Sequence, residues 1–256
     1  AAVGGICAFL SAYLMLKGWS LIGDALSHTS LAGVAGGMIA GINPVAGAIA
    51  ACLGGALCVE GVRRHFKDQS ELAVAIVMAA GIGLAGVLSG FVPNSSSFNS
   101  FMFGSILTVS EQEVQMIVVI SVLAVAFCFF LRKELFLMSF DERHARCVGV
   151  PVSLINFGFV IAVALVVAVA ARTVGSLIVS SMMVVPVACA LQISRSWKQC
   201  CLYASTVGML TSLGGLVVSY ELGLKPGGTI VLLAVVTLLF IFLVKRVVLL
   251  LKTRTV

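Results

Sequence analysis

The sequence predicts an all-α, polytopic membrane protein with about 8–9 transmembrane helices and short loops. Of its 256 residues, 61% are hydrophobic and only 10% are charged, whereas an ordinary soluble domain has about 25% charged residues. Apolar runs recur from Val3 to Leu251 with short polar breaks, so no stretch remains for a soluble domain. We therefore expect a single transmembrane domain over residues 1–256. A cytosolic enzyme, a nucleic-acid-binding protein and a disulfide scaffold are excluded.

The individual spans follow from apolar runs of about 17 to 25 residues, the length that crosses a bilayer as a helix. The segment Phe101–Thr108 is apolar but too short to span, which leaves a re-entrant piece or a short surface helix. Residues 93–97, before it, predict an exposed loop. The candidate spans are residues 2–16, 22–41, 44–62, 71–92, 113–131, 152–171, 174–193, 199–219 and 228–247.

The lysines and arginines indicate the orientation of these spans, because cytoplasmic loops are enriched in both. Arg172 and Lys225 lie in one set of alternate gaps, and all the other cations lie in the other set. This pattern places the C-terminus and the long loop 132–150 in the cytoplasm. It also explains the net charge of +6 without an anionic partner. The cations of the predicted cytoplasmic gaps are Lys17, Arg63, Arg64, Lys67, Arg132, Lys133, Arg143, Arg146, Arg195, Lys198, Lys245, Arg246, Lys252 and Arg254.

Several glycines recur at four-residue spacing, which puts them on one face of a helix. Gly33, Gly37 and Gly41 form one such set, and Gly86 and Gly90 form another. Small residues on one face let helices approach closely in lipid. We expect tight internal packing at both sets.

Asp24 and His28 are the candidate functional residues. Both lie inside the second predicted span, whereas the other acids lie in loops or at helix ends. Their spacing of four places them on one face of a helix, about one turn apart. An ionisable residue inside a span costs about 2.5–3.5 kcal/mol on insertion scales and by default indicates function.

Three interpretations of this pair remain open from the residues alone. A carboxylate and an imidazole on consecutive turns form half of a site for a divalent first-row metal ion. Alternatively, Asp24 caps the cytoplasmic end of its helix and pairs with His28, or the two form a proton relay. A metal site needs further ligands, since zinc usually has four. These would come from elsewhere in the fold, from a second copy of the chain or from water.

The loop Arg132–Val150 predicts a short helix that docks on a partner, because it mixes apolar and charged residues at helical spacing. Phe140, His144 and Val148 recur every four residues on one face of that helix. The alternative is a helix lying on the lipid surface. The adjacent acids Asp141 and Glu142 make an anionic membrane surface a less suitable neighbour.

Motifs for catalysis are absent from the sequence. No G-x-x-x-x-G-K-[ST], H-E-x-x-H or G-x-S-x-G occurs, which argues against nucleotide hydrolysis, a zinc protease and a hydrolase. We therefore expect a transport protein that is not an enzyme and has no permanently bound cofactor. If transport is active, another polypeptide supplies the energy.

The run S-L-I-G-D-A-L-S-H-T-S-L-A-G-V-A (residues 20–35) resembles the signature region of the permease subunits of bacterial manganese, zinc and iron ABC importers. The resemblance continues in order along nearly the whole chain. It includes F-G-S-I-L-T-V-S (103–110), S-F-D-E-R-H-A-R-C-V-G-V-P (139–151), V-G-S-L-I-V-S-S-M-M-V-V-P (174–186) and S-Y-E-L-G-L-K-P-G-G-T-I-V-L (219–232).

The resemblance implies a role for each candidate residue. Asp24 and His28 match the family's intramembrane metal-coordinating pair. The cytoplasmic stretch from Phe140 to Val150 matches the segment that contacts the ATPase, so a coupling helix is expected there. The residues of this coupling region are Phe140, Asp141, Glu142, His144 and Gly149.

The resemblance also implies the partners and the location. These importers contain two permease copies and two ATPase subunits, and an extracytoplasmic metal-binding protein supplies the ion. Two copies of Asp24 and His28 would then provide four ligands. The expected location is the bacterial inner or plasma membrane.

Zinc is the favoured cargo, ahead of manganese and iron. Many members, especially manganese importers, have a proline where this chain has Ala32, and S-L-A-G after His28 looks more like the zinc branch. The run F-G-S-I-L-T-V-S-E-Q-E-V indicates the same. The alternatives are a manganese or iron importer of this family and a proton-coupled secondary transporter.

Overall fold

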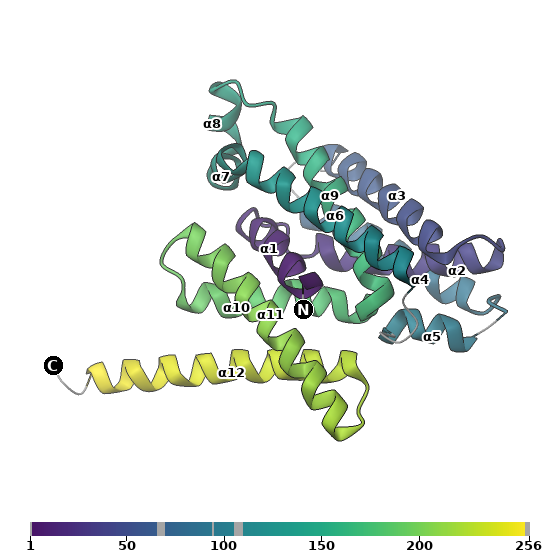
Figure 1. Ribbon diagram of the computed structural model, residues 1–256. Helices are drawn as coiled ribbons and strands as arrows, with labels where there is room; N and C mark the ends of the chain where they lie inside the picture. The colour runs from purple at the N-terminus through teal and green to yellow at the C-terminus, as the bar shows by residue number, and fades with distance from the viewer. Residues whose placement is uncertain (1, 66–69, 94, 105–109, 254–256) are drawn as a thin grey trace. The chain divides into compact units, whose positions relative to one another are not determined.

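The computed structural model describes residues 2–65, 70–93, 95–104 and 110–253, and within these ranges every regular element is an α-helix (Figure 1). The helices are α1 (Ala2–Leu16), α2 (Ile22–Ile39), α3 (Pro44–His65), α4 (Ser70–Ser89), α5 (Ser95–Phe103), α6 (Glu111–Phe130), α7 (Arg132–Phe140), α8 (Glu142–Cys147), α9 (Val152–Val174), α10 (Ser176–Ile193), α11 (Trp197–Leu222) and α12 (Pro226–Thr253).

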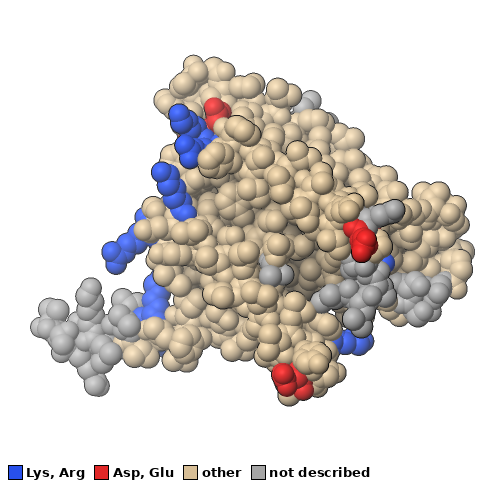
Figure 2. Space-filling view, viewed as in Figure 1, with Lys and Arg blue, Asp and Glu red and all other residues tan. Residues whose placement is uncertain are grey.

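Each predicted span coincides with one long helix of the described chain. Seven of these helices, α3, α4, α6, α9, α10, α11 and α12, are long and apolar enough to cross a membrane. Helix α1 is apolar but has only 15 residues, and α2 has 18 residues that include Asp24 and His28. The all-α prediction is confirmed, and the predicted number of spans is close to the observed one. Figure 2 shows a face on which charged side chains are sparse, as expected beside lipid.

Internal packing divides the chain into two compact units. One contains residues 13–180, and the other contains residues 1–12 and 181–256. Asp24, His28 and the predicted coupling region all lie in the first unit. The single domain over residues 1–256 stays a prediction.

Glycines bring α2 into close contact with α3. A Cβ added at Gly33 would lie 2.3 Å from the carbonyl oxygen of Gly47, and one at Gly37 would lie 3.3 Å from Cα of Pro44. The predicted tight packing is therefore confirmed at Gly33 and Gly37. Gly41 lies beyond the end of α2 at φ +69° and has open space around its Cβ position. The expectation is also wrong at the second set, because a Cβ at Gly86 would meet no atom within 4 Å.

The short helix α5 packs on α2. Its Phe98 and Phe101 are 6% and 7% exposed and join a core cluster with Leu31, Val34 and Ala35 of α2. Burial of these two rings makes α5 part of the core of its unit. The predicted loop over residues 93–97 is wrong at its end, since α5 begins at Ser95. Residues 105–109 of the predicted short apolar segment lie outside the described residues.

Helix α9 is held by polar contacts at its end. Arg172 Nε lies 3.0 Å from Glu113 Oε1 of α6, and its guanidinium carbon lies 4.6 Å from the ring centre of Phe101. Glu113 also completes a capping box with Ser110, which satisfies backbone N–H groups at the start of α6. This contact joins the end of α9 to the start of α6. The charge pattern assigns both of these helix ends to the non-cytoplasmic side.

Small residues also hold the other unit together. A Cβ at Gly208 of α11 would lie 2.7 Å from the carbonyl oxygen of Gly4, and one at Gly215 would lie 2.6 Å from Cα of Ile230 in α12. Gly223 ends α11 in the left-handed conformation at φ +63°. This unit therefore packs α11 against both the start of α1 and α12 without bulky side chains between the backbones.

The contact between α2 and α3 generates a stability prediction. Gly33→Ala should destabilise the protein by about 1–3 kcal/mol, the usual cost of overpacking, because the new methyl group would overlap the Gly47 carbonyl. Gly54→Ala on α3 is the matched control, since its Cβ position meets no atom within 4 Å. Thermal unfolding in detergent measures both variants. Equal melting temperatures would contradict the close approach.

Candidate functional site

The helix that carries the candidate pair begins at a tight corner. Helix α1 ends in a Schellman motif, in which Trp19 N donates to Leu14 O (2.7 Å) and Gly18 N donates to Met15 O (3.1 Å). Gly18 has φ +74°, a conformation that glycine adopts without strain. Helix α2 then starts at Ile22, so the corner places Asp24 in the first turn of α2.

Asp24 and His28 face one another across one turn of α2, as predicted. His28 Nε2 lies 3.5 Å from Asp24 Oδ1, and the side chains are 21% and 28% exposed. The neighbouring hydroxyls bond back into the helix, Ser27 Oγ to Asp24 O and Thr29 Oγ1 to Leu26 O. These hydroxyls bond to the backbone and do not orient the imidazole, so the half-buried acid–imidazole pair is separate from them.

The pair provides two metal-ligand atoms from one chain. No group of three or more His, Cys, Asp or Glu side chains that could hold a metal ion occurs among the described residues. A carboxylate oxygen and an imidazole nitrogen each bind zinc at about 2.0–2.2 Å. Among the described residues, Asp24 and His28 therefore offer two potential ligand atoms, fewer than the four that zinc usually has.

Two glycines that the sequence analysis did not single out fix the backbone beside His28. A Cβ at Gly81 of α4 would lie 3.0 Å from Thr29 N and 3.2 Å from the His28 carbonyl carbon. A Cβ at Gly55 of α3 would lie 2.9 Å from Thr29 Oγ1. Helices α3 and α4 therefore both contact this turn of α2. Gly81 lacks the four-residue spacing that would have identified it.

The predicted coupling region forms two helices, not one. Asp141 has an extended backbone (φ −152°, ψ 104°) that ends α7, and its Oδ1 accepts hydrogen bonds from Arg143 N (2.8 Å) and His144 N (3.0 Å). Asp141 is thus the N-cap of α8. These two hydrogen bonds lower the pKa of the Asp141 carboxyl group.

The prediction that Phe140, His144 and Val148 form one face of a single helix is wrong, because the helix is broken at Asp141. Phe140 ends α7 and Val148 follows α8, and their exposed fractions are 72% and 64%. Gly149, at φ +88°, ends α8 in a second Schellman motif, with Val150 N donating to Ala145 O. The apolar surface is still exposed, but two helices contribute to it.

Glu142 points inward, unlike its neighbours in the predicted coupling region. Its Oε1 lies 3.0 Å from Nζ of Lys17, at the α1–α2 corner, and accepts a hydrogen bond from Asn156 Nδ2 of α9 (3.2 Å). His144 is exposed. The region therefore has an exposed side at Phe140, His144 and Val148 and a side bound to the rest of its unit through Glu142.

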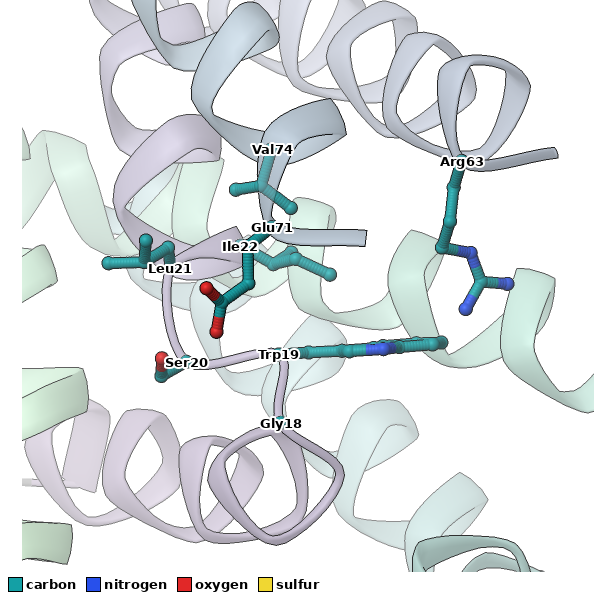
Figure 3. A pocket seen from close by; sticks show the side chains of 8 residues that line it. All are labelled: Gly18, Trp19, Ser20, Leu21, Ile22, Arg63, Glu71 and Val74. Carbon is teal, nitrogen blue, oxygen red and sulfur yellow. The ribbon is translucent and has the colours of Figure 1, made fainter. Parts of the chain in front are cut away.

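The corner encloses a small cavity between Trp19, Arg63, Glu71 and Val74 (Figure 3). The guanidinium of Arg63 lies over the Trp19 ring, 4.2 Å from its centre. Arg63 is also paired with Glu60, at 2.7 Å. The start of α2 thus lies among charged groups of α3 and α4, although the span itself is apolar.

Seven apolar helices in the described residues, an acid–imidazole pair on α2 and the lack of a nucleotide-binding motif are typical of a membrane transport subunit. The sequence profile of the ABC 3 transport family matches residues 1–245, and the chain belongs to this family. It is thus a multi-pass permease subunit and not itself an enzyme, as predicted.

Individual relatives agree with this assignment. The chain is 33% identical over 244 residues to a probable metal transport system membrane protein of Treponema pallidum (strain Nichols), covering 94% of this chain and 91% of that protein. It is 35% identical to the chelated iron transport system membrane protein YfeC of Yersinia pestis (94% and 81% covered). It is 30% identical to the manganese import system permease protein ScaB of Streptococcus parasanguinis (95% and 87% covered).

A solved structure has the same fold. The chain superposes on PsaBC from Streptococcus pneumoniae, determined in complex with Fab, with a TM-score of 0.82 and 28% identity. The alignment covers 94% of this chain and 87% of that chain.

The Asp141 cap generates a prediction about α8. Asp141→Ala should speed amide hydrogen exchange at Arg143 and His144, because both N–H groups lose their acceptor. Asp141→Asn is the matched control, since its side-chain oxygen still caps the helix. Exchange measured by mass spectrometry on a peptide that covers α8 tests this. Equal protection in Asp141→Ala and wild type would show that the cap is not needed to hold α8.

Proposed function

We propose that this chain is the permease subunit of an ATP-driven importer of divalent transition-metal ions, working by alternating access. The observation that carries the proposal is the half-buried Asp24–His28 pair on α2. Both residues belong to the motif that resembles the metal-importing permeases. The pair would bind the ion transiently, because a closed four-ligand site would hold zinc too tightly for release.

The geometry of the pair favours a ligand site over a structural ion pair. The Nε2–Oδ1 distance of 3.5 Å exceeds the 2.7–3.2 Å of an ordinary N–H···O hydrogen bond. Within the described part of the chain, neither side chain has another hydrogen-bond or ion-pair partner. Half-buried polar groups that are incompletely paired gain most from binding an ion.

The incomplete ligand set supports assembly from two copies. Each copy would contribute one carboxylate and one imidazole to a pathway between them, so the ion would meet up to four protein ligands along the pathway without all four closing around it at once. The other partners are an ATPase subunit, which docks on the exposed surface of α7 and α8, and an extracytoplasmic metal-binding protein. The assembly would lie in the bacterial inner or plasma membrane, with the C-terminus of this chain in the cytoplasm.

Membership of an ABC transport family supports ATP as the energy source over the proton-coupled alternative. ATP binding and hydrolysis on the partner would move α7 and α8 and thereby reopen the pathway. The chain itself contains no phosphate-binding loop. An inactivated ATPase partner should therefore abolish transport.

Removal of either ligand should stop import. In vesicles containing the permease, its ATPase and the metal-binding protein, Asp24→Ala and His28→Ala should each lower ATP-dependent uptake at least about tenfold, the lower range for altered metal sites. Glu111→Ala is the matched control, because Glu111 is also an acid in the first turn of a helix but is exposed. Copurification with the ATPase checks assembly. If neither Asp24→Ala nor His28→Ala assembles with the ATPase, the pair has a structural role.

The cargo is decided by competition in the same vesicles. Carboxylate and imidazole ligands suit zinc, manganese and iron, and geometry determines the choice among them. The names of two relatives indicate manganese import and chelated-iron transport, whereas Ala32 and the run after His28 favour zinc. We expect ATP-dependent zinc uptake that manganese and ferrous iron inhibit only weakly. Faster manganese or iron uptake would correct the metal and leave the mechanism unchanged.

A further inference from the structure

Lys17 is a buried cation at the corner between α1 and α2. Its side chain is 8% exposed, and its Nζ lies 3.0 Å from Glu142 Oε1 of α8. The same Nζ donates a hydrogen bond to Asn156 Oδ1, while Asn156 Nδ2 donates to Glu142 Oε1. The three side chains therefore contact one another pairwise, and each comes from a different element of the unit formed by residues 13–180.

Trp19 provides a second set of contacts at the corner. Trp19, two residues after Lys17, is 7% exposed. Lys17 Nζ lies 4.1 Å from the centre of its ring, and the Arg63 guanidinium lies 4.2 Å from it. Cations over an indole ring are attracted to its face. Lys17 and Trp19 thus bind the corner to α8, α9 and α3 together (Figure 3 shows Trp19 and Arg63).

The ion pair between Lys17 and Glu142 is close enough to shift the pKa values of both side chains. Burial lowers the pKa of Lys17 to about 8, although Glu142 opposes this shift. Burial would raise the pKa of Glu142, but the charge and hydrogen bond of Lys17 bring it below its usual value. Each group therefore opposes the effect of burial on the pKa of the other. Removing one partner of such a pair leaves an uncompensated buried charge.

We propose that Lys17, Glu142 and Asn156 form the connection through which movement of α8 reaches the metal-binding helix. This inference rests on the proposed function. The outer side of the α7–α8 region, at Phe140 and Val148, is exposed and can contact the ATPase. On its inner side, Glu142 binds Lys17 of the corner. Lys17 is followed closely by the first turn of α2, so a displacement of the corner displaces Asp24. The three residues are positioning residues and do not touch the ion.

The chemistry of the contact suits transmission better than passive support. A well-packed apolar cluster often stabilises a fold as well as a buried ion pair does. A paired charge additionally fixes which atoms stay together, because any sliding of Glu142 away from Lys17 breaks the ion pair and the hydrogen bond that Glu142 accepts from Asn156. Helix α8 and the corner therefore have to move together.

The test measures metal transported per ATP hydrolysed by the assembled importer in vesicles. Lys17→Met and Glu142→Gln should preserve copurification with the ATPase and ATP hydrolysis, while lowering metal imported per ATP at least about fivefold, the lower range for coupling between sites. The exchanged pair, Lys17→Glu with Glu142→Lys, should recover much of this ratio. Glu113→Gln is the matched control, because Glu113 forms a similar 3.0 Å ion pair with Arg172 away from α8 and α2.

The outcomes separate this inference from the proposed function. ATP-driven metal uptake by the wild-type complex tests the function, whereas the ratio in the variants tests the connection. An unchanged ratio in Glu142→Gln, or an equal fall in Glu113→Gln, overturns the connection while the function stands. If Lys17→Met does not assemble, Glu142→Gln decides the matter, since it removes the charge but keeps the size and hydrogen-bonding capacity of the side chain. A fall in hydrolysis and import in strict proportion also overturns it.

Discussion

Helix α2 approaches α3 and α4 closely because glycines remove the side chains that would keep the backbones apart. Gly33 meets Gly47, while Gly55 and Gly81 meet Thr29 from two sides. In lipid, where apolar side chains gain little by leaving their surroundings, such van der Waals contact is a main source of helix association. The turn that contains His28 is thereby held in place by its backbone. This backbone contact does not involve the side chains of Asp24 and His28.

The charged residues around this turn differ in how many partners they have. Among the described residues, the side chains of Asp24 and His28 are paired only with one another. The charged residues nearest the corner each have several partners: Lys17 contacts Glu142 and Asn156, and Arg63 contacts Glu60 and Trp19. The contrast follows burial, because Lys17 and Glu60 are 8% exposed whereas His28 and Asp24 are 21% and 28% exposed, and an unpaired charge costs more where it is buried more deeply. The corner is therefore held by several polar contacts, whereas the pair beside it has a single one among the described residues.

The sequence predicted the long helices well because apolar length and charge placement are properties of neighbouring residues. It also predicted that Asp24 and His28 lie together on one face of a helix, since residues four apart are about one turn apart. It did not predict the break at Asp141, where a side-chain cap overrides the helical spacing of Phe140 and His144. Nor could spacing predict that Glu142 turns inward, because its partners Lys17 and Asn156 are distant in the chain.

Helix α9 is tied at both ends, through Asn156 near its start and Arg172 near its end. Its 23 residues extend about 34 Å at 1.5 Å per residue. Between these ends the buried residues of α9 are all apolar, so its polar contacts with other elements lie near its two ends. The helix is thus anchored by separate residues on the two sides that the charge pattern assigns: to the Lys17 corner on one, and to α6 and α5 on the other.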